Sequence, residues 1–95
     1  MYYVVYIGYE PDASLYERNV ISFHQACETF VSIVEAREYI KEYIIDDLKL
    51  DASAGEVDTD EIEVDYKEDK DRVRLDAYYG DTCIYVYECW IMESL

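Results

Sequence analysis

Residues 61–66 and 72–77 alternate strictly between charged and apolar side chains. This alternation is typical of β-strands that bury one face. The five charged residues between the two stretches predict a hairpin that folds about Glu68 and Asp69. In that register opposite charges and apolar residues match together, and a slip of one residue would lose every match. The predicted cross-strand pairs are Asp65–Arg72, Glu63–Arg74, Val64–Val73 and Ile62–Leu75.

Gly80-Asp81 predicts a second tight hairpin, because glycine at the first turn position suits a two-residue loop. The strand that follows, from Thr82 to Met92, has apolar residues at both odd and even positions, which point to opposite faces of a sheet. We therefore expect this strand inside the sheet. The predicted pairs across this hairpin are Ala77–Ile84, Leu75–Val86 and Arg74–Tyr87, the last with a cation–π contact.

Two further strands are predicted in the first third of the chain. Tyr2–Tyr9 is β-branched or aromatic on both parities, which indicates a central strand covered on both faces. Pro11 and its neighbours end it in a turn. A second extended stretch runs from Val20 to Val31. The alternation of apolar and polar residues breaks down at Gln25–Glu28, so a bulge or bend is expected there.

A helix is expected to begin after Ser32, because Ser32 and Glu35 have the spacing of a capping box. It should end near Leu48–Leu50, with Gly55 in the exit loop able to adopt a positive φ. Apolar residues at spacings of three and four predict its buried stripe. These residues are Ile33, Ala36, Ile40, Tyr43, Ile44 and Leu48.

The resulting fold class is α+β: a mostly antiparallel sheet with one packed helix, in the order β-β-α-β-β-β. Ninety-five residues make a single domain, residues 1–95. Hydrophobic residues are 52% of the chain, which is enough to build a core. Val34 and Ile45 lie on a flank of the helix outside the stripe, which allows a homodimer through the helix.

The net charge of −15 is large for one small domain. It disfavours direct binding of nucleic acid, which needs a basic surface, and docking to an anionic membrane. No apolar run is long enough to span a bilayer, and the first residues lack the basic start of a signal peptide. Three cysteines without a pairing pattern favour packed thiols in a reducing cytosol, so we expect a cytoplasmic protein.

The acidic residues form two predicted rows. One lies on the outer helix face, with carboxylates at intervals of roughly 6 Å. The other follows the strand face of Glu61, Glu63 and Asp65, at about 6.8 Å per two residues. Such rows could imitate the two backbones of a duplex to a basic groove. The predicted partner-binding residues are Glu35, Glu38, Glu42, Asp46, Asp58, Asp60, Glu61, Glu63, Asp65, Glu68 and Asp69. The alternatives are a solvated acidic face that serves solubility, and halophilic adaptation, which the many tyrosines and isoleucines disfavour.

Catalytic and metal-binding patterns are weak, so we predict no enzyme, no cofactor and no metal site. His24 and Cys27 are the nearest approach to a nucleophile pair, but Glu28 would raise the pKa of the thiol, and a packed structural cysteine is expected. Asp58-Thr59-Asp60-Glu61 lacks the glycine and the twelfth-position glutamate of a calcium loop. Three glycines allow no phosphate-binding loop. Twelve tyrosines suit a protein-binding surface or simple β-propensity.

In size, acidity and lack of catalytic groups the chain resembles phage-encoded DNA mimics of the anti-CRISPR and antirestriction type, and nuclease immunity proteins share these traits. The resemblance covers the whole chain but no specific motif. It implies an inhibitor that occupies the basic nucleic-acid-binding surface of a nuclease or other effector protein. A non-catalytic structural or assembly module of a phage or mobile element remains the alternative.

Overall fold

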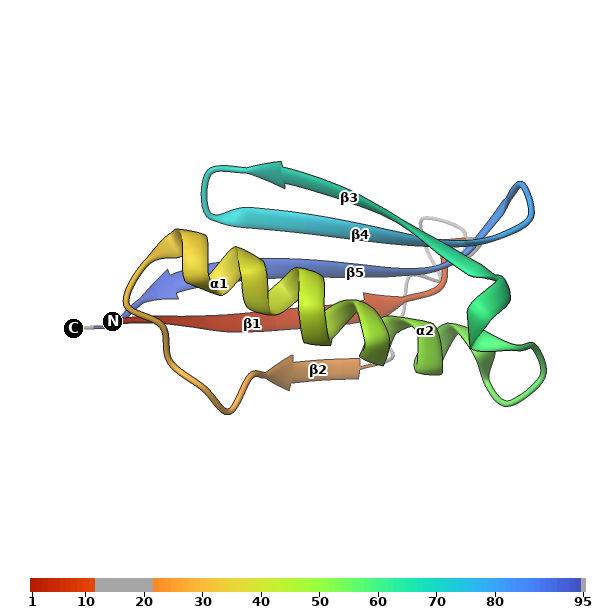
Figure 1. Cartoon of the computed structure of the whole chain (residues 1–95), viewed down its shortest axis with the longest axis horizontal. Coiled ribbons are helices and arrows are strands. Elements are labelled where there is room, and N and C mark those ends of the chain that lie inside the picture. Colours follow the sequence, from red (N-terminus) through yellow and green to blue (C-terminus); the bar gives the residue numbers. More distant parts are fainter. Residues whose placement is uncertain (12–21, 95) are drawn as a thin grey trace.

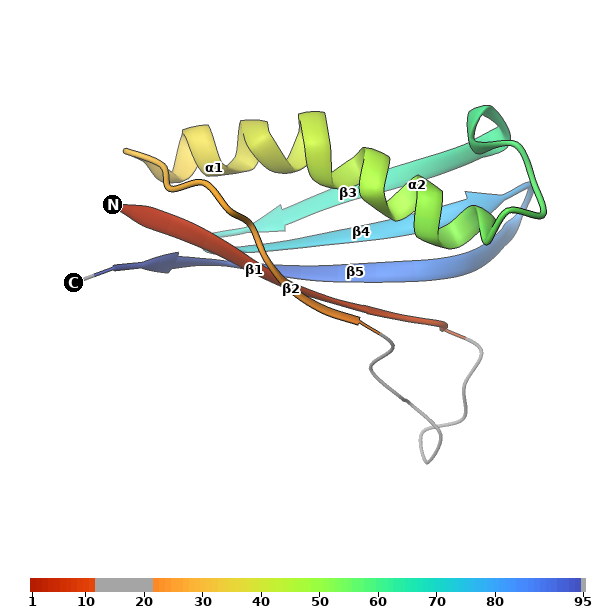
Figure 2. The same cartoon turned by 90° about the horizontal axis from the view of Figure 1, so that it is seen from below.

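The computed structural model describes residues 1–11 and 22–94. Five antiparallel strands form one sheet, in the order β2-β1-β5-β4-β3. One continuous helical stretch, residues 33–53, packs on one face of this sheet (Figures 1 and 2).

The strands are β1 Tyr2–Tyr9, β2 Ser22–Gln25, β3 Ile62–Asp69, β4 Arg72–Tyr79 and β5 Thr82–Glu93. The helical segments are α1 Ile33–Tyr39, the π-helical η1 Ile40–Ile44, α2 Ile45–Ser53 and the 3-10 turn η2 Thr59–Glu61. The α+β class and the interior positions of β1 and β5 are confirmed.

The core lies between the helix and the sheet. Alternate residues of β1, β3, β4 and β5 point toward the helix and bury their side chains there. They meet a buried stripe on the helix, which is formed by an apolar residue at every fourth position. The main buried residues are Val4, Tyr6, Ala36, Ile40, Ile44, Leu48, Ile62, Val73, Leu75, Ala77, Tyr85, Tyr87, Cys89 and Ile91.

The π-helical segment explains why this stripe is straight. In an ideal α-helix a strict four-residue spacing drifts around the axis, because a turn takes 3.6 residues. The i→i+5 bond from the Ile45 N–H to the Ile40 carbonyl adds residues to one turn and cancels that drift. Tyr43 was predicted in the stripe, and this was wrong: Tyr43 is 54% exposed, whereas Ile44 is 1% exposed. The helix also continues beyond the predicted end, to Ser53, where Ala54 and Gly55 both have positive φ.

The helix begins as predicted. The Glu35 backbone N–H donates to Ser32 Oγ at 3.1 Å, and the Glu35 carboxylate accepts from the Val31 N–H at 3.0 Å. The carboxylate therefore reaches one residue further back than the Ser32 N–H expected for a capping box.

Ser32→Ala is expected to lower the free energy of unfolding by about 0.5–2 kcal/mol, because it leaves the Glu35 N–H without its partner. Urea unfolding of the variant beside wild type measures the change. Thr29→Ala, an exposed hydroxyl three residues earlier, is the control and should have little effect. Equal midpoints for all three proteins would show that the cap does not stabilise the helix.

The predicted β3–β4 register is wrong by four residues. Asp69 pairs with Arg72, Asp65 with Asp76 and Glu63 with Tyr78, and the turn is Lys70-Asp71 with Lys70 at φ 55°. The observed register joins all eight residues of β3 to all eight of β4, whereas the predicted one pairs only four residues of each strand and leaves residues 76–79 without a partner in β3. Exposed ion pairs contribute only about 0.2–1 kcal/mol each, so the longer ladder and its apolar pairs decide the register.

The Gly80-Asp81 turn of the second hairpin is confirmed, since Tyr79 pairs with Thr82. A register shift between Ala77 and Tyr78 then displaces every later pair by one residue. The predicted Ala77–Ile84, Leu75–Val86 and Arg74–Tyr87 pairs are therefore wrong. The observed pairs are Ala77–Tyr85, Leu75–Tyr87 and Arg74–Glu88. Tyr87 consequently points into the core, and the cation–π contact forms instead between Arg72 and the Trp90 ring, at 5.5 Å.

The stretch predicted as a strand from Val20 to Val31 is shorter in its described part. It pairs with β1 only over Ser22–Gln25 and returns as a single bridge from Phe30 to Tyr2. The bend predicted at Gln25–Glu28 is confirmed, because the ladder ends at Gln25. Val20 and Ile21 lie outside the described residues. The expectation that β1 is covered on both faces is wrong for its middle, where the side chains that face away from the helix stay partly exposed.

Candidate functional site

The outer face of the helix carries an unbroken row of carboxylates. Glu35, Glu38, Glu42 and Asp46 are all exposed. Their spacing of three, four and four residues follows the same phase as the buried stripe on the opposite side. The π-helical segment therefore straightens the acidic row as it straightens the core stripe.

The acidic row continues beyond the helix. Asp46 and Asp60 line one hollow of about 240 Å³, together with Lys49, Leu50 and Thr59. The turn that carries Asp60 is held by its own cap, because the Asp58 carboxylate accepts from the Asp60 N–H at 3.0 Å. Asp58, Asp60 and Glu61 thus extend the helix row at its C-terminal end, and we call these seven residues the acidic surface. Its members are Glu35, Glu38, Glu42, Asp46, Asp58, Asp60 and Glu61.

The basic residues in the first part of the helix are drawn away from the acidic surface. Arg37 Nε lies 3.5 Å from the Glu68 carboxylate, and Arg37 also donates to the Lys70 carbonyl. Lys41 lies over the Tyr66 ring, 4.8 Å from its centroid. Both cations therefore face β3, whereas Lys49 lies in the hollow with Asp46 and Asp60. Glu68, predicted as a partner-binding residue, is instead engaged within the protein.

Two helix carboxylates that the sequence did not single out have a structural role. Asp51 accepts a hydrogen bond from the core tyrosine Tyr87, and Asp47 accepts one from Tyr6 at 3.4 Å. Burial raises the pKa of both tyrosines above the ordinary value, and the nearby carboxylates raise it further. These bonds fix α2 to β1 and β5. The sequence signal for these two bonds is the spacing of the aspartates, which are four residues apart and therefore lie on the same face of the helix, opposite the core-facing tyrosines.

The second predicted row does not lie beside the first. Glu63, Asp65 and Asp69 alternate with the core-facing residues of β3, so they point to the sheet face that is opposite the helix. The sheet therefore separates the two rows, and one flat partner surface cannot meet both. The acids at the start of β3 join the helix row, and those within β3 do not.

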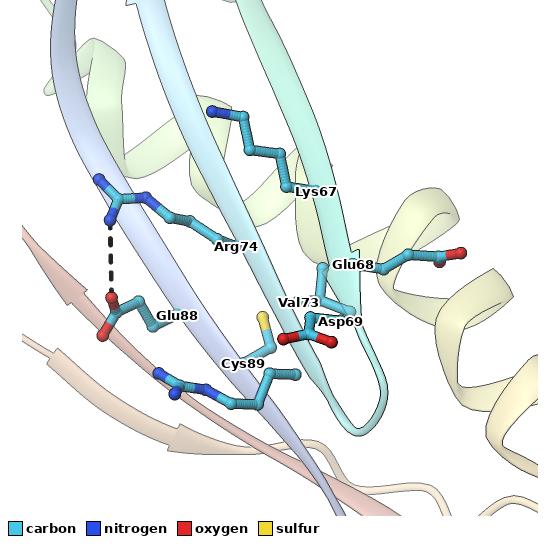
Figure 3. A pocket seen from close by; sticks show the side chains of 8 residues that line it. Lys67, Glu68, Asp69, Val73, Arg74, Glu88 and Cys89 are labelled. Atoms are coloured by element: carbon cyan, nitrogen blue, oxygen red, sulfur yellow. Dashed lines mark ion pairs between the residues drawn. The ribbon is translucent and has the colours of Figure 1, made fainter.

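The sheet face opposite the helix holds a mixed cluster of charges (Figure 3). Arg74 bonds Asp76 at 2.9 Å and lies 3.8 Å from Glu88, and these contacts raise the pKa of its guanidinium, the bond to Asp76 most. Tyr9 donates to the same Glu88 at 3.1 Å. The cluster borders a hollow of about 250 Å³ lined also by Lys67 and other residues of the β3–β4 hairpin. Cations and carboxylates are nearly balanced here, in contrast to the acidic surface.

The histidine and the cysteines show no catalytic arrangement among the described residues. His24 stacks on Tyr6 with a centroid distance of 5.0 Å. Cys27 is exposed, so the expectation of a packed thiol is wrong at that position. Cys89 is the buried thiol, and burial raises its pKa to about 12. In the described ranges 1–11 and 22–94, no three His, Cys, Asp or Glu side chains are grouped so that they could hold a metal ion.

Comparison with protein-family models, with curated proteins and with solved structures gives no match. Within the described part of the chain, no helix is both long and apolar enough to cross a bilayer.

Proposed function

We propose that this protein is an inhibitor of the anti-CRISPR or antirestriction type, which binds the basic nucleic-acid-binding surface of a bacterial defence nuclease. The observation that carries the proposal is the acidic surface, where seven exposed carboxylate residues follow one helix and the turn beyond it. A surface that is shaped to bind phosphates attracts carboxylates for the same electrostatic reason. The protein therefore competes directly with nucleic acid for that surface. This action needs no catalytic group and no cofactor, and it takes place in the cytoplasm of the host cell.

The acidic surface supplies mainly the speed and the orientation of association. Complementary charge raises the association rate constant and excludes wrong partners, whereas affinity comes mostly from a few buried anchors. Three exposed apolar side chains lie on the same helix and can serve as such anchors. They are Val34, Tyr43 and Leu50.

The proposed contact uses one charged row rather than an imitation of both strands of a duplex. Glu63 and Asp65 belong to the other side of the sheet, so a partner bound on the helix does not meet them. The inhibitor is thus proposed to enter a basic groove with its helix leading.

Reversing Glu38, Glu42 and Asp46 to lysine is expected to slow association with the basic partner by about tenfold or more at low salt. The loss should shrink as the Debye length falls from about 30 Å at 0.01 M salt to about 8 Å at 0.15 M. A partner is first retained from a bacterial lysate and identified by mass spectrometry. Its association rate constant is then measured against ionic strength for each variant.

The matched control reverses Glu63, Asp65 and Asp69, which changes the net charge by the same amount on the opposite face. A third triple, Asp58, Asp60 and Glu61, tests the extension of the row beyond the helix. The control should leave most of the rate intact. Equal rates for wild type and the helix triple, with no salt dependence, would contradict the proposal and favour a structural or assembly module whose acidity serves solubility.

A further inference from the structure

The sheet face opposite the helix, here called the open face, has no described helix or strand over it (Figure 2). Its residues are those that alternate with the core positions of each strand. Phe23 of β2 is 70% exposed, Met92 is exposed, and Trp90 lies partly exposed between Val5 and Arg72. Aromatic residues, methionine and arginine are the side chains enriched in protein interfaces.

Only one end of the open face is available for contact. Val86, Tyr9 and Asp76 face the same side but are buried within the protomer. The accessible part therefore lies toward the first residues of β1 and the last of β5. Its apolar residues are Tyr3, Val5, Ile7, Phe23, Trp90 and Met92.

The open face is close to neutral although the chain carries −15. At the accessible end three basic residues point to it beside two carboxylates, so the net charge of that end is +1. The basic residues are Lys67, Arg72 and Arg74, and the acidic ones are Asp69 and Glu88. Asp76 is buried, and Glu63 and Asp65 lie toward the other end. A strongly basic partner is drawn to the acidic surface instead, and nucleic acid is repelled by the whole molecule.

We infer that the open face binds a second copy of this chain, in a twofold dimer that stacks sheet on sheet and leaves both helices outside. A twofold contact places a patch against itself, so the patch must be self-complementary. The open face meets that condition, because it combines an apolar strip with cations and carboxylates in similar numbers. The inference does not depend on the proposed function.

The accessible area of the open face is small. Five strands about 4.8 Å apart, over roughly five residues at about 3.3 Å each, give on the order of 400 Å² of flat area per copy. Once the relief of the side chains is included, the total area buried by two copies reaches the lower end of the range for specific interfaces. An interface of this size is typical of weak, transient contacts, so we expect the dimer to form only at high protein concentration.

The salt dependence distinguishes this contact from the proposed inhibition. In the dimer the two acidic helices lie on the order of 30 Å apart, across two sheets. At about 0.15 M salt the Debye length is about 8 Å, so their repulsion is screened, whereas at about 0.01 M it is not. Dimerisation therefore strengthens with salt, and binding of a basic partner through the helix weakens.

Sedimentation velocity of the full chain, from about 5 to 500 µM at both salt concentrations, tests the inference. Wild type should shift from monomer to dimer with concentration, more readily at high salt. Phe23→Glu should weaken the dimer about tenfold or more. Val34→Glu is the matched control, because it adds the same charge at a helix position that is 62% exposed, and it should leave the dimer unchanged. Met92→Glu repeats the test on β5, and circular dichroism verifies that each variant is folded.

A wild-type monomer at every concentration and both salts would overturn the inference. So would a dimer that resists Phe23→Glu and Met92→Glu but is lost in Val34→Glu, which would place the contact on the helix. Neither outcome affects the helix triple described above, so a failure of the dimer and a failure of the proposed inhibition are separate results.

Discussion

Ile44→Ala is expected to lower the free energy of unfolding by about 2–5 kcal/mol, the range for removing a buried aliphatic side chain. Ile44 is 1% exposed and packs within the stripe that joins the helix to the sheet. Tyr43→Ala removes more atoms from the adjacent position but should cost far less, because Tyr43 is 54% exposed and its ring lies beside that of Tyr39 on the helix surface. The sequence alone places both residues in the stripe.

Urea unfolding of both variants beside wild type measures this difference. The π-helical segment is what separates the two residues, since it sets the phase with which α2 meets the sheet. Similar losses for the two variants would show that the helix is in the phase of a regular α-helix. Ile45→Ala, at a half-buried position, should give an intermediate loss and serves as the internal standard.

The free energy of unfolding is expected to fall steeply between about pH 9 and pH 12. The folded-state pKa of Cys89 is about 12, raised by burial from the ordinary 9.0, and burial also raises the pKa of Tyr6 and Tyr87 above 10.0. Above the ordinary pKa the unfolded chain releases these protons while the folded chain keeps them. Stability is therefore full below pH 9 and is lost as the pH rises, by up to about 1.4 kcal/mol per pH unit for each group.

Two variants separate the groups that contribute. Cys89→Ala should flatten the loss that begins at about pH 9, although it lowers the starting stability. Tyr87→Phe should flatten the part above pH 10, and Tyr79→Phe, at an exposed position, should leave the profile unchanged. Urea unfolding at a series of pH values gives the slopes. A wild-type stability that stays level from pH 8 to pH 11 would contradict the expected burial of these protons.

The kinds of element and their order follow from local sequence patterns. The capping residues Ser32 and Glu35 fix where the helix begins, because their hydrogen bonds are local. Alternation along β3 and β4 fixes which side chains of these strands are buried. This prediction holds although the predicted register was wrong, because the true register differs from it by an even number of residues. The exposure of Glu38, Glu42 and Asp46 also follows from the helical period.

The register and the partners of individual side chains depend on how distant elements pack together. The shift at Ala77–Tyr78 turns Tyr87 into the core, and the length of the β3–β4 ladder outweighs the visible charge matches. Whether Asp51 belongs to a binding surface or bonds a core tyrosine depends on a contact 36 residues away. The two rows of carboxylates look alike in the sequence, yet they lie on opposite sides of the sheet. Local patterns fix which way a side chain points relative to its own strand or helix, but the packing of distant elements fixes what it meets there.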